Sequence, residues 1–389
     1  MGKGNILVLG NSGVGKSTLI NAVLGERRAA TGWGNSGRTK RLYLYENSEL
    51  PFRLIDTIGF EPSYFKERTA INAVKDWSKE RAKDADPDND INVIWYCVDG
   101  TSRKLFPKTI TNLIKATSIW KTVPVIVVIT KSYSVPDRKH NIEMVQNIFF
   151  NQKKKINLKR IIPVVAQTYI LNETAFAPPE GITDLIDATN ELLPEGKKAA
   201  KLDVGKYKLG RKRVFAQSVV AASTVSGVAV GALPIPVADG VILSGVEMAE
   251  IKTIAALYGI KSSDRTQKFL NTIVEVGTVS AAAKAIISAI KAIPGIAVAA
   301  AVLNAVIAGC FVAAIGEGSV LAFEQVYLGN KTLDDLDWLK KLMENQFAGD
   351  FLKKVKEILV AINDKTDAQE IVEMILNLFA DTKRKGNKK

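Results

Sequence analysis

The sequence is poor in the residues that carry thiol and imidazole chemistry. Its 389 residues include one histidine, His140, and two cysteines, Cys97 and Cys310. A single histidine argues against a histidine-based catalytic triad or zinc site. Both cysteines lie in apolar runs, where a thiol packs as a small hydrophobic group, and they make no disulfide framework. No secretory signal precedes the first predicted strand, so we expect a cytoplasmic protein.

Acidic residues are fewer than basic ones, and the formal net charge is +13. The excess is clustered. Eight basic residues and one acid lie between Lys197 and Arg213, and shorter runs cover 153–160 and 383–389. Basic runs are usually solvated, but they also bind anionic lipid or RNA phosphates. Charge alone therefore leaves both kinds of partner open.

The two halves of the sequence differ in pattern. Up to about residue 195, short apolar runs alternate with helix-length segments, which predicts a mostly parallel sheet with helices on both faces. Beyond the basic stretch, helix-length apolar runs predict an all-α half. The predicted divisions are an α/β P-loop domain at 1–195, a basic linker at 196–210, an apolar helical domain at 211–328, and C-terminal helices with a basic tail at 329–389. The predicted strands lie at 6–9, 41–45, 52–55, 92–98, 123–129 and 161–165, and predicted helices include 16–24, 106–119 and 142–150.

The first predicted strand is followed by a phosphate-binding motif. Residues 10–17 fit the Walker A spacing and open a predicted helix, which is the context that this motif requires. Backbone N–H groups of such a loop and the helix N-terminus attract phosphate. We expect Lys16 to act in catalysis at the terminal phosphates and Ser17 to bind Mg²⁺. The predicted cradle consists of Gly10, Asn11, Ser12, Gly13, Val14, Gly15, Lys16, Ser17 and Thr18.

A second motif, Asp56-Thr57-Ile58-Gly59, follows another apolar strand. An aspartate at a strand end suits the magnesium shell, and the Gly59 backbone suits the γ-phosphate. Between the two motifs, residues 25–40 are rich in small side chains, as a mobile switch would be. We select Thr39 there as a catalytic and Mg²⁺-binding residue, with Thr31 as the alternative. Arg38 is more simply explained as a solvated side chain than as an arginine finger.

Together these motifs resemble the Era-like, translation-factor-related GTPases over about half of the chain. The resemblance implies GTP/GDP and Mg²⁺ as ligands, and it assigns base contacts to Thr130 and Lys131, in Thr-Lys-Ser-Tyr, and to Ala166. Tyr133 stands where the family has the aspartate that reads guanine, so weaker guanine selectivity is expected, and Asp137 is a possible substitute that more simply caps a turn. Phe60 stands where relatives place a water-orienting glutamine, so hydrolysis should be slow.

Residues 210–320 resemble a bacterial helical family of unknown function that often follows an Era-like domain, and several of its members are membrane-associated. The whole arrangement is also similar to immunity-related and dynamin-like GTPases. Two stretches, 214–233 and 293–316, contain no charge. The second is long and apolar enough to span a bilayer, and the first is borderline because polar side chains dilute it. A soluble helical bundle is the alternative explanation. We prefer association with the inner face of the cell membrane.

These observations lead to one preferred hypothesis and two rivals. The preferred one is a GTP-binding switch with slow hydrolysis, coupled to a helical domain that meets anionic membrane lipid. A homodimer through the GTPase domain is a further expected partner, because a second copy could supply a missing catalytic group. The first rival is a soluble RNA- or ribosome-associated GTPase, with nucleic acid as the partner. The second is a structural oligomer in which nucleotide only supports folding.

Overall fold

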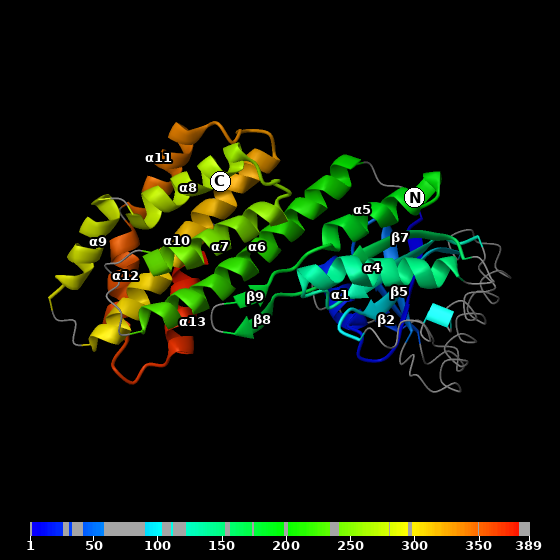
Figure 1. Cartoon of the computed structure of the whole chain (residues 1–389), viewed down its shortest axis with the longest axis horizontal. Helices are drawn as coiled ribbons and strands as arrows, with labels where there is room; N and C mark the ends of the chain where they lie inside the picture. The colour runs from blue at the N-terminus through cyan, green and yellow to red at the C-terminus, as the bar shows by residue number, and fades with distance from the viewer. Residues whose placement is uncertain are drawn as a thin grey trace. The chain divides into compact units, whose positions relative to one another are not determined.

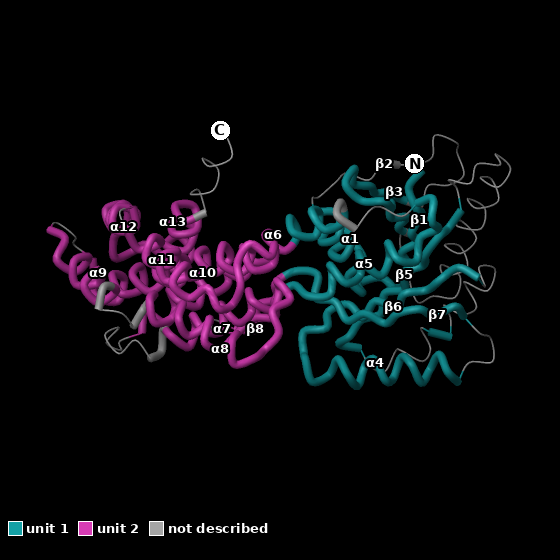
Figure 2. Tube along the Cα trace, turned by 90° about the horizontal axis from the view of Figure 1, so that it is seen from above, with its two compact units in different colours: residues 1–167, 179–211 teal, residues 168–178, 212–389 magenta. Residues whose placement is uncertain are grey.

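The computed structural model divides into two compact units, which Figure 2 colours separately. Unit 1 comprises residues 1–167 and 179–211, and unit 2 comprises 168–178 and 212–389. The structure describes residues 2–25, 31–32, 42–57, 90–102, 110–111, 122–151, 156–172, 175–197, 201–233, 241–279, 281–294, 298–348 and 350–380.

Unit 1 is built on one sheet, as the alternating pattern predicted. In its described part, seven strands lie in the order β2-β3-β4-β1-β5-β6-β7. Figure 1 labels β2, β5 and β7 of this sheet. Strands β4, β1, β5, β6 and β7 run parallel to one another. Strand β3 is antiparallel to both β4 and β2. The strands are β1 (Gly4–Gly10), β2 (Thr31–Gly32), β3 (Leu42–Glu46), β4 (Phe52–Thr57), β5 (Ile91–Asp99), β6 (Val125–Thr130) and β7 (Leu158–Pro163).

Helices cover both faces of this sheet. Every residue of β1 is buried, as expected of a central parallel strand. The face that carries Leu7 and Leu9 packs against Val145 of α4. On the other face, the Trp95 indole N–H donates to the Thr189 hydroxyl of α5 at 2.9 Å. The helices are α1 (Lys16–Leu24), α4 (Val135–Phe150), α5 (Ile182–Leu192) and the short 3-10 helix η3 (Glu195–Lys197).

The described residues of unit 2 are helical apart from one hairpin, which the sequence pattern did not predict. Helix α10 is its core, because the side chains along its length from Ala305 to Glu324 are almost all buried. It packs against α7, α11, α12 and α13. The elements are β8 (Tyr169–Asn172), β9 (Ala175–Ala177), α7 (Val241–Leu257), α8 (Asp264–Val274), the π-helix η5 (Glu275–Val279), α9 (Ala281–Lys291), α10 (Ala300–Tyr327), α11 (Leu336–Phe347), α12 (Asp350–Ala361) and α13 (Ala368–Ala380).

The stretch that the sequence predicts as a basic linker, 196–210, is largely helical. Helix α6 (Lys201–Gly231) begins in unit 1 and ends in unit 2. Several of its basic side chains have partners within their own unit, which explains why a charged run is ordered. Lys208 forms an ion pair with Asp187 in unit 1, and in unit 2 Lys212 donates to the Leu257 carbonyl oxygen.

Glycines let α6 approach α10 closely. A Cβ atom at Gly227 would lie 2.8 Å from a methyl carbon of Val312, and one at Gly231 would lie 2.6 Å from the Asn304 carbonyl oxygen. Neither contact is sterically acceptable. The four-residue glycine spacing that resembles a membrane packing motif therefore serves a helix contact inside unit 2.

Unit 2 also buries a group of carboxyl side chains. Glu247 and Glu250 of α7 are fully buried, and Glu317 of α10 is nearly so. No hydrogen-bond partner for either Glu250 carboxyl oxygen occurs among the described residues, and Gly316 leaves room for this side chain. Burial, followed by the neighbouring Glu247 and Glu317, raises the pKa of Glu250 well above its usual value.

We expect Glu250→Gln to stabilise unit 2 at neutral and higher pH. Folded Glu250 keeps its proton to a higher pH than the unfolded chain does. The contribution of Glu250 to the free energy of unfolding is therefore complete below the ordinary glutamate pKa of about 4.3. It is lost as the pH rises from there through the pKa of Glu250 in the folded protein. The variant should exceed the wild type by about 1–3 kcal/mol at pH 8 and lose most of that advantage at pH 4.

Urea unfolding of the full chain, followed through the helical signal at both pH values, measures this difference. The control is Glu357→Gln, because Glu357 is exposed on α12. Identical pH dependence in the wild type and in Glu250→Gln would show that Glu250 is ionised in the folded protein.

Candidate nucleotide-binding site

The phosphate-binding loop begins where β1 passes close to β5. Gly10 pairs with Cys97 in the sheet, and a Cβ atom at Gly10 would lie 2.6 Å from the Cys97 carbonyl oxygen. The loop then turns through Gly13 and Gly15, whose φ angles of 78° and 93° favour glycine. Gly15 is the N-cap of α1, so the open N-terminus of that helix faces the loop.

Lys16 lies across this loop. Its side chain is nearly buried, at 9% exposure. Its Nζ atom donates to the carbonyl oxygens of Gly10 and Asn11, at 2.9 and 3.1 Å. The loop's own carbonyl groups thus hold the ammonium at the cavity, where phosphate oxygens could replace them as acceptors.

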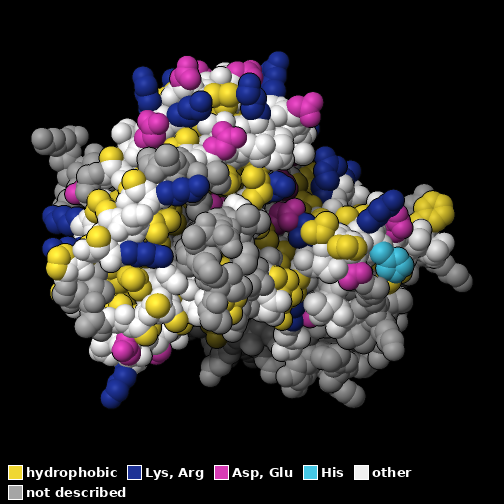
Figure 3. Space-filling model, turned by 60° about the vertical axis from the view of Figure 1, so that its left-hand side comes forward, with side chains coloured by type: hydrophobic (Ala, Val, Ile, Leu, Met, Phe, Trp, Pro, Cys, Tyr) yellow, Lys and Arg dark blue, Asp and Glu magenta, His cyan; other side chains and the backbone are white. Residues whose placement is uncertain are grey.

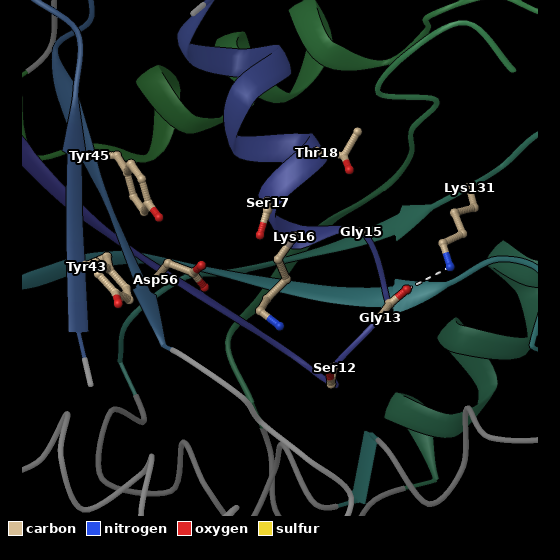
Figure 4. A pocket seen from close by; sticks show the side chains of 10 residues that line it. All are labelled: Ser12, Gly13, Gly15, Lys16, Ser17, Thr18, Tyr43, Tyr45, Asp56 and Lys131. Carbon is tan, nitrogen blue, oxygen red and sulfur yellow. Dashed lines mark hydrogen bonds between the residues drawn. The ribbon is translucent and has the colours of Figure 1, made fainter. Parts of the chain in front are cut away.

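A cavity of about 500 Å³ opens beside the loop (Figure 4). Ser17 of α1 and Asp56, at the end of β4, both line it, and Asp56 is only 7% exposed. In the part of the chain that the structure describes, no three acidic, histidine or cysteine side chains form a complete metal cage. A hydroxyl and a carboxylate beside a phosphate-binding loop fit Mg²⁺, which typically binds one or two carboxylates together with substrate phosphates.

The end of β6 closes the opposite side of the cavity. The Thr130 hydroxyl is within hydrogen-bond distance of the carbonyl oxygens of Val14 and Val98. Lys131 has a φ of 51°, and its Nζ atom donates both to the Gly13 carbonyl oxygen and to Asp99, each at 2.7 Å. Thr130 and Lys131 thus connect the predicted base-binding motif to the phosphate-binding loop.

Asp99 fixes the Lys131 ammonium. Burial by itself would raise the pKa of Asp99, but hydrogen bonds from Lys131 and Thr101 outweigh it and lower that pKa. The backbone N–H and the hydroxyl of Thr101 both donate to the Asp99 carboxylate, at 2.9 and 2.6 Å. The aspartate is therefore ionised and oriented.

Two tyrosines that the sequence analysis missed also line the cavity. Tyr43 and Tyr45 lie on β3, and Tyr43 is the direct cross-strand partner of Asp56. Burial, then the charge of Asp56, then Tyr43 raise the pKa of Tyr45. The alternation in Leu-Tyr-Leu-Tyr, which places the tyrosines on one face of a strand, was the available signal.

The structure brings most of the predicted residues together. Gly10, Asn11 and Val14 support the loop through their carbonyl groups, and Thr130 supports it from β6. Ala166 does not line the cavity. Those that line it are Ser12, Gly13, Gly15, Lys16, Ser17, Thr18, Asp56 and Lys131.

Several predicted residues lie outside the described residues: Thr39, Gly59, Arg38 and Phe60. The side chain of Thr31 is also outside them, although its backbone belongs to β2. Their proposed roles therefore remain predictions. Asp137 belongs to the first turn of α4 and does not line the cavity, which agrees with the simpler explanation of this residue.

Comparison with known proteins agrees with this geometry. Residues 5–131 match the family model described as "50S ribosome-binding GTPase". The match includes the phosphate-binding loop, Asp56 and Lys131. This part of the chain matches a P-loop GTPase family.

Relatives of this GTPase domain include GTPase Era of Vibrio vulnificus, 26% identical over 165 residues, which are 42% of this chain and 47% of the relative. GTPase Era of Lactobacillus helveticus is 28% identical over 196 residues, 50% of this chain and 55% of the relative. GTPase Der of Trichlorobacter lovleyi is 41% identical over 61 residues, 15% and 14% of the two chains. The chain spans about half the length of the Era relatives it matches.

Among solved structures, Era in complex with MgGDPNP and a segment of 16S ribosomal RNA matches at 19% identity. The match covers 58% of this chain and 67% of that chain, with a TM-score of 0.31. A score of this size is too low to support a structural inference.

We expect Lys16→Ala to weaken triphosphate binding by at least about 100-fold while the fold is kept. A lysine ammonium makes charge-assisted hydrogen bonds worth about 1.5–3 kcal/mol each to phosphate oxygens. Isothermal titration with GTP and Mg²⁺ measures the loss. Lys206→Ala is the matched control, because Lys206 is an exposed lysine of unit 1 that does not line the cavity. Wild-type affinity in folded Lys16→Ala would remove Lys16 from the site.

Proposed function

We propose that the protein is a GTP-binding switch that hydrolyses GTP slowly. The observation that carries the proposal is the convergence of three groups on one cavity: the Lys16 ammonium, the Ser17–Asp56 pair and Lys131. They match the three parts of a magnesium nucleotide, which are the phosphates, the metal and the base side. The named GTPase relatives support guanine as the base.

Each residue has a task that its position supports. Lys16 neutralises charge on the terminal phosphates, and Ser17 and Asp56 hold Mg²⁺, which when bound neutralises phosphate charge. Lys131 packs the base side against the loop. Thr39 and Gly59 would complete the phosphate end when the switch segments order. Phe60 cannot orient water, so a partner or a second copy of the chain would supply that group.

Guanine selectivity should be weaker than in relatives that carry the missing aspartate. Tyr133 cannot accept the two ring N–H groups of guanine as a carboxylate does. A lost charge-assisted pair corresponds to about a ten- to hundred-fold drop in selectivity.

Unit 2 is the part of the chain that would respond to the bound nucleotide. Helix α6, which has residues in both units, would transmit the change. The family description names the 50S ribosome, which favours a ribosome-associated role as the second candidate function. The match that carries this description ends at residue 131 and includes none of the helical unit. Two free, buried cysteines suit a cytoplasmic location.

Membrane association of the helical unit has less support than the hydropathy pattern alone implied. Two helices are long and apolar enough to span a bilayer, but in α10 94% of the most apolar window is buried inside the protein, against 61% in α6. The basic residue Arg213 pairs with Glu324 within the unit. On the face drawn in Figure 3, basic side chains are scattered among acidic and apolar ones. We therefore propose that α10 is the core of a helical bundle.

Intrinsic GTP turnover should be about 10⁻³ s⁻¹ or slower, because the water-positioning residue is absent. Phosphate release measured with GTP and with ATP, over a range of protein concentrations, gives the rate, the base preference and any dimer dependence. Lys16→Ala supplies the background rate. Turnover near 1 s⁻¹ in dilute protein would contradict the proposed slow switch.

Val306→Arg should unfold the helical unit or destabilise it by about 3–5 kcal/mol, because Val306 is fully buried in α10 and burying a charged side chain there removes it from water. Val360→Arg is the control, since Val360 is 72% exposed on α12. Thermal unfolding measures both variants.

The wild-type chain should also remain in the supernatant when spun with anionic liposomes. Flotation of the wild type that resists high salt would instead establish insertion.

A further inference from the structure

The wall of the cavity on the β3 side consists of two tyrosines. Tyr43 and Tyr45 alternate with buried Leu44, so both side chains extend from the same face of β3. Antiparallel pairing sets Tyr43 opposite Asp56. The two rings lie 6.4 Å apart at an angle of 39°. In Figure 4 they stand beside Asp56, on the side of the cavity away from Lys131.

Strand order decides which end of a nucleotide these tyrosines would meet. Strand β3 is adjacent to β4, which carries Asp56, and it lies four positions from β6, which leads to Lys131. Neighbouring strands are about 4.8 Å apart, so β3 and β6 are separated by roughly 19 Å. The tyrosines are therefore too far from the base side to stack on a purine. Their place is at the phosphate and metal end.

Hydroxyl groups at that end would suit both a buried carboxylate and the water around a metal ion. Asp56 is nearly buried, and a buried carboxylate stays ionised only with a metal or hydrogen-bond donors around it. Ser17 and Asp56 would give Mg²⁺ two protein ligands, and Mg²⁺ otherwise keeps ordered water that needs partners of its own. A phenol hydroxyl can donate to a carboxylate and accept from water. Phenylalanine would pack equally well but could do neither.

We propose that the hydroxyl groups of Tyr43 and Tyr45 position Asp56 and the water around it, and thereby set the Mg²⁺ requirement for nucleotide binding. They act as positioning residues rather than as metal ligands. The proposal rests on the proposed function, because it assumes that magnesium nucleotide occupies this cavity. Groups that orient a metal ligand in this way commonly change metal affinity by about 10–100-fold.

The test measures binding of fluorescent GDP to the full chain while free Mg²⁺ is varied in an EDTA buffer. Tyr43→Phe, Tyr45→Phe and the double variant are compared with the wild type. Each substitution removes one oxygen atom and keeps the ring, so packing is preserved. Tyr169→Phe is the matched control, since Tyr169 is 43% exposed on β8 in unit 2. Thermal unfolding confirms that each variant is folded.

We expect the double variant to need about tenfold more Mg²⁺ for half-maximal binding, with at least one single variant intermediate. GDP affinity in EDTA alone should change by less than about twofold, because the hydroxyl groups act through the metal end. An unchanged Mg²⁺ requirement in the double variant would overturn the proposal. Equal weakening with and without Mg²⁺ would also overturn it, in favour of direct nucleotide contact. A wild-type chain that binds no GDP would refute the proposed function itself, which separates the two failures.

Discussion

The hydrogen bonds between the end of β6 and the phosphate-binding loop hold the candidate site together. A loop rich in glycine loses much conformational freedom when it is ordered, so it needs fixed partners. Thr130 and Lys131 supply them through the carbonyl oxygens of Val14 and Gly13, and Asp99 fixes Lys131 in turn. The base side and the phosphate side are consequently one hydrogen-bonded assembly. Because all of these groups lie at the carboxyl ends of parallel strands, the sheet itself determines their spacing.

Much of this unit could be predicted from sequence because its signals are local. The predicted strands of the first half are each present, and α1 begins at Lys16 and ends at Leu24 as predicted. Tyr43 and Tyr45 were missed because the alternation shows only that they share a strand face, whereas their place at the cavity depends on the register of β3 against β4. The predicted base contact at Ala166 came from family resemblance alone, and the cavity does not extend to it.

In the second half of the chain, composition does not distinguish a membrane-spanning helix from the buried core helix of a bundle. Lipid tails and a protein core are equally apolar, so hydropathy identifies a helix that avoids water without identifying what surrounds it. The basic stretch before it was misleading for a similar reason. Glycines at 205 and 210 among lysines are typical of a linker, yet ion pairs and carbonyl contacts order this stretch as part of α6. In both stretches the contacts come from other parts of the chain, which composition does not show.

The central position of α10 has a consequence for how the protein is made. Its covering helices α11, α12 and α13 follow it in the chain and end about fifty residues later. At a synthesis rate of about 5–20 residues per second, the helix waits roughly 3–10 s before these partners exist. During that interval the face of α10 that α11, α12 and α13 later cover stays exposed. The order of the helices along the chain therefore makes the partly synthesised protein more prone to aggregation than the finished one.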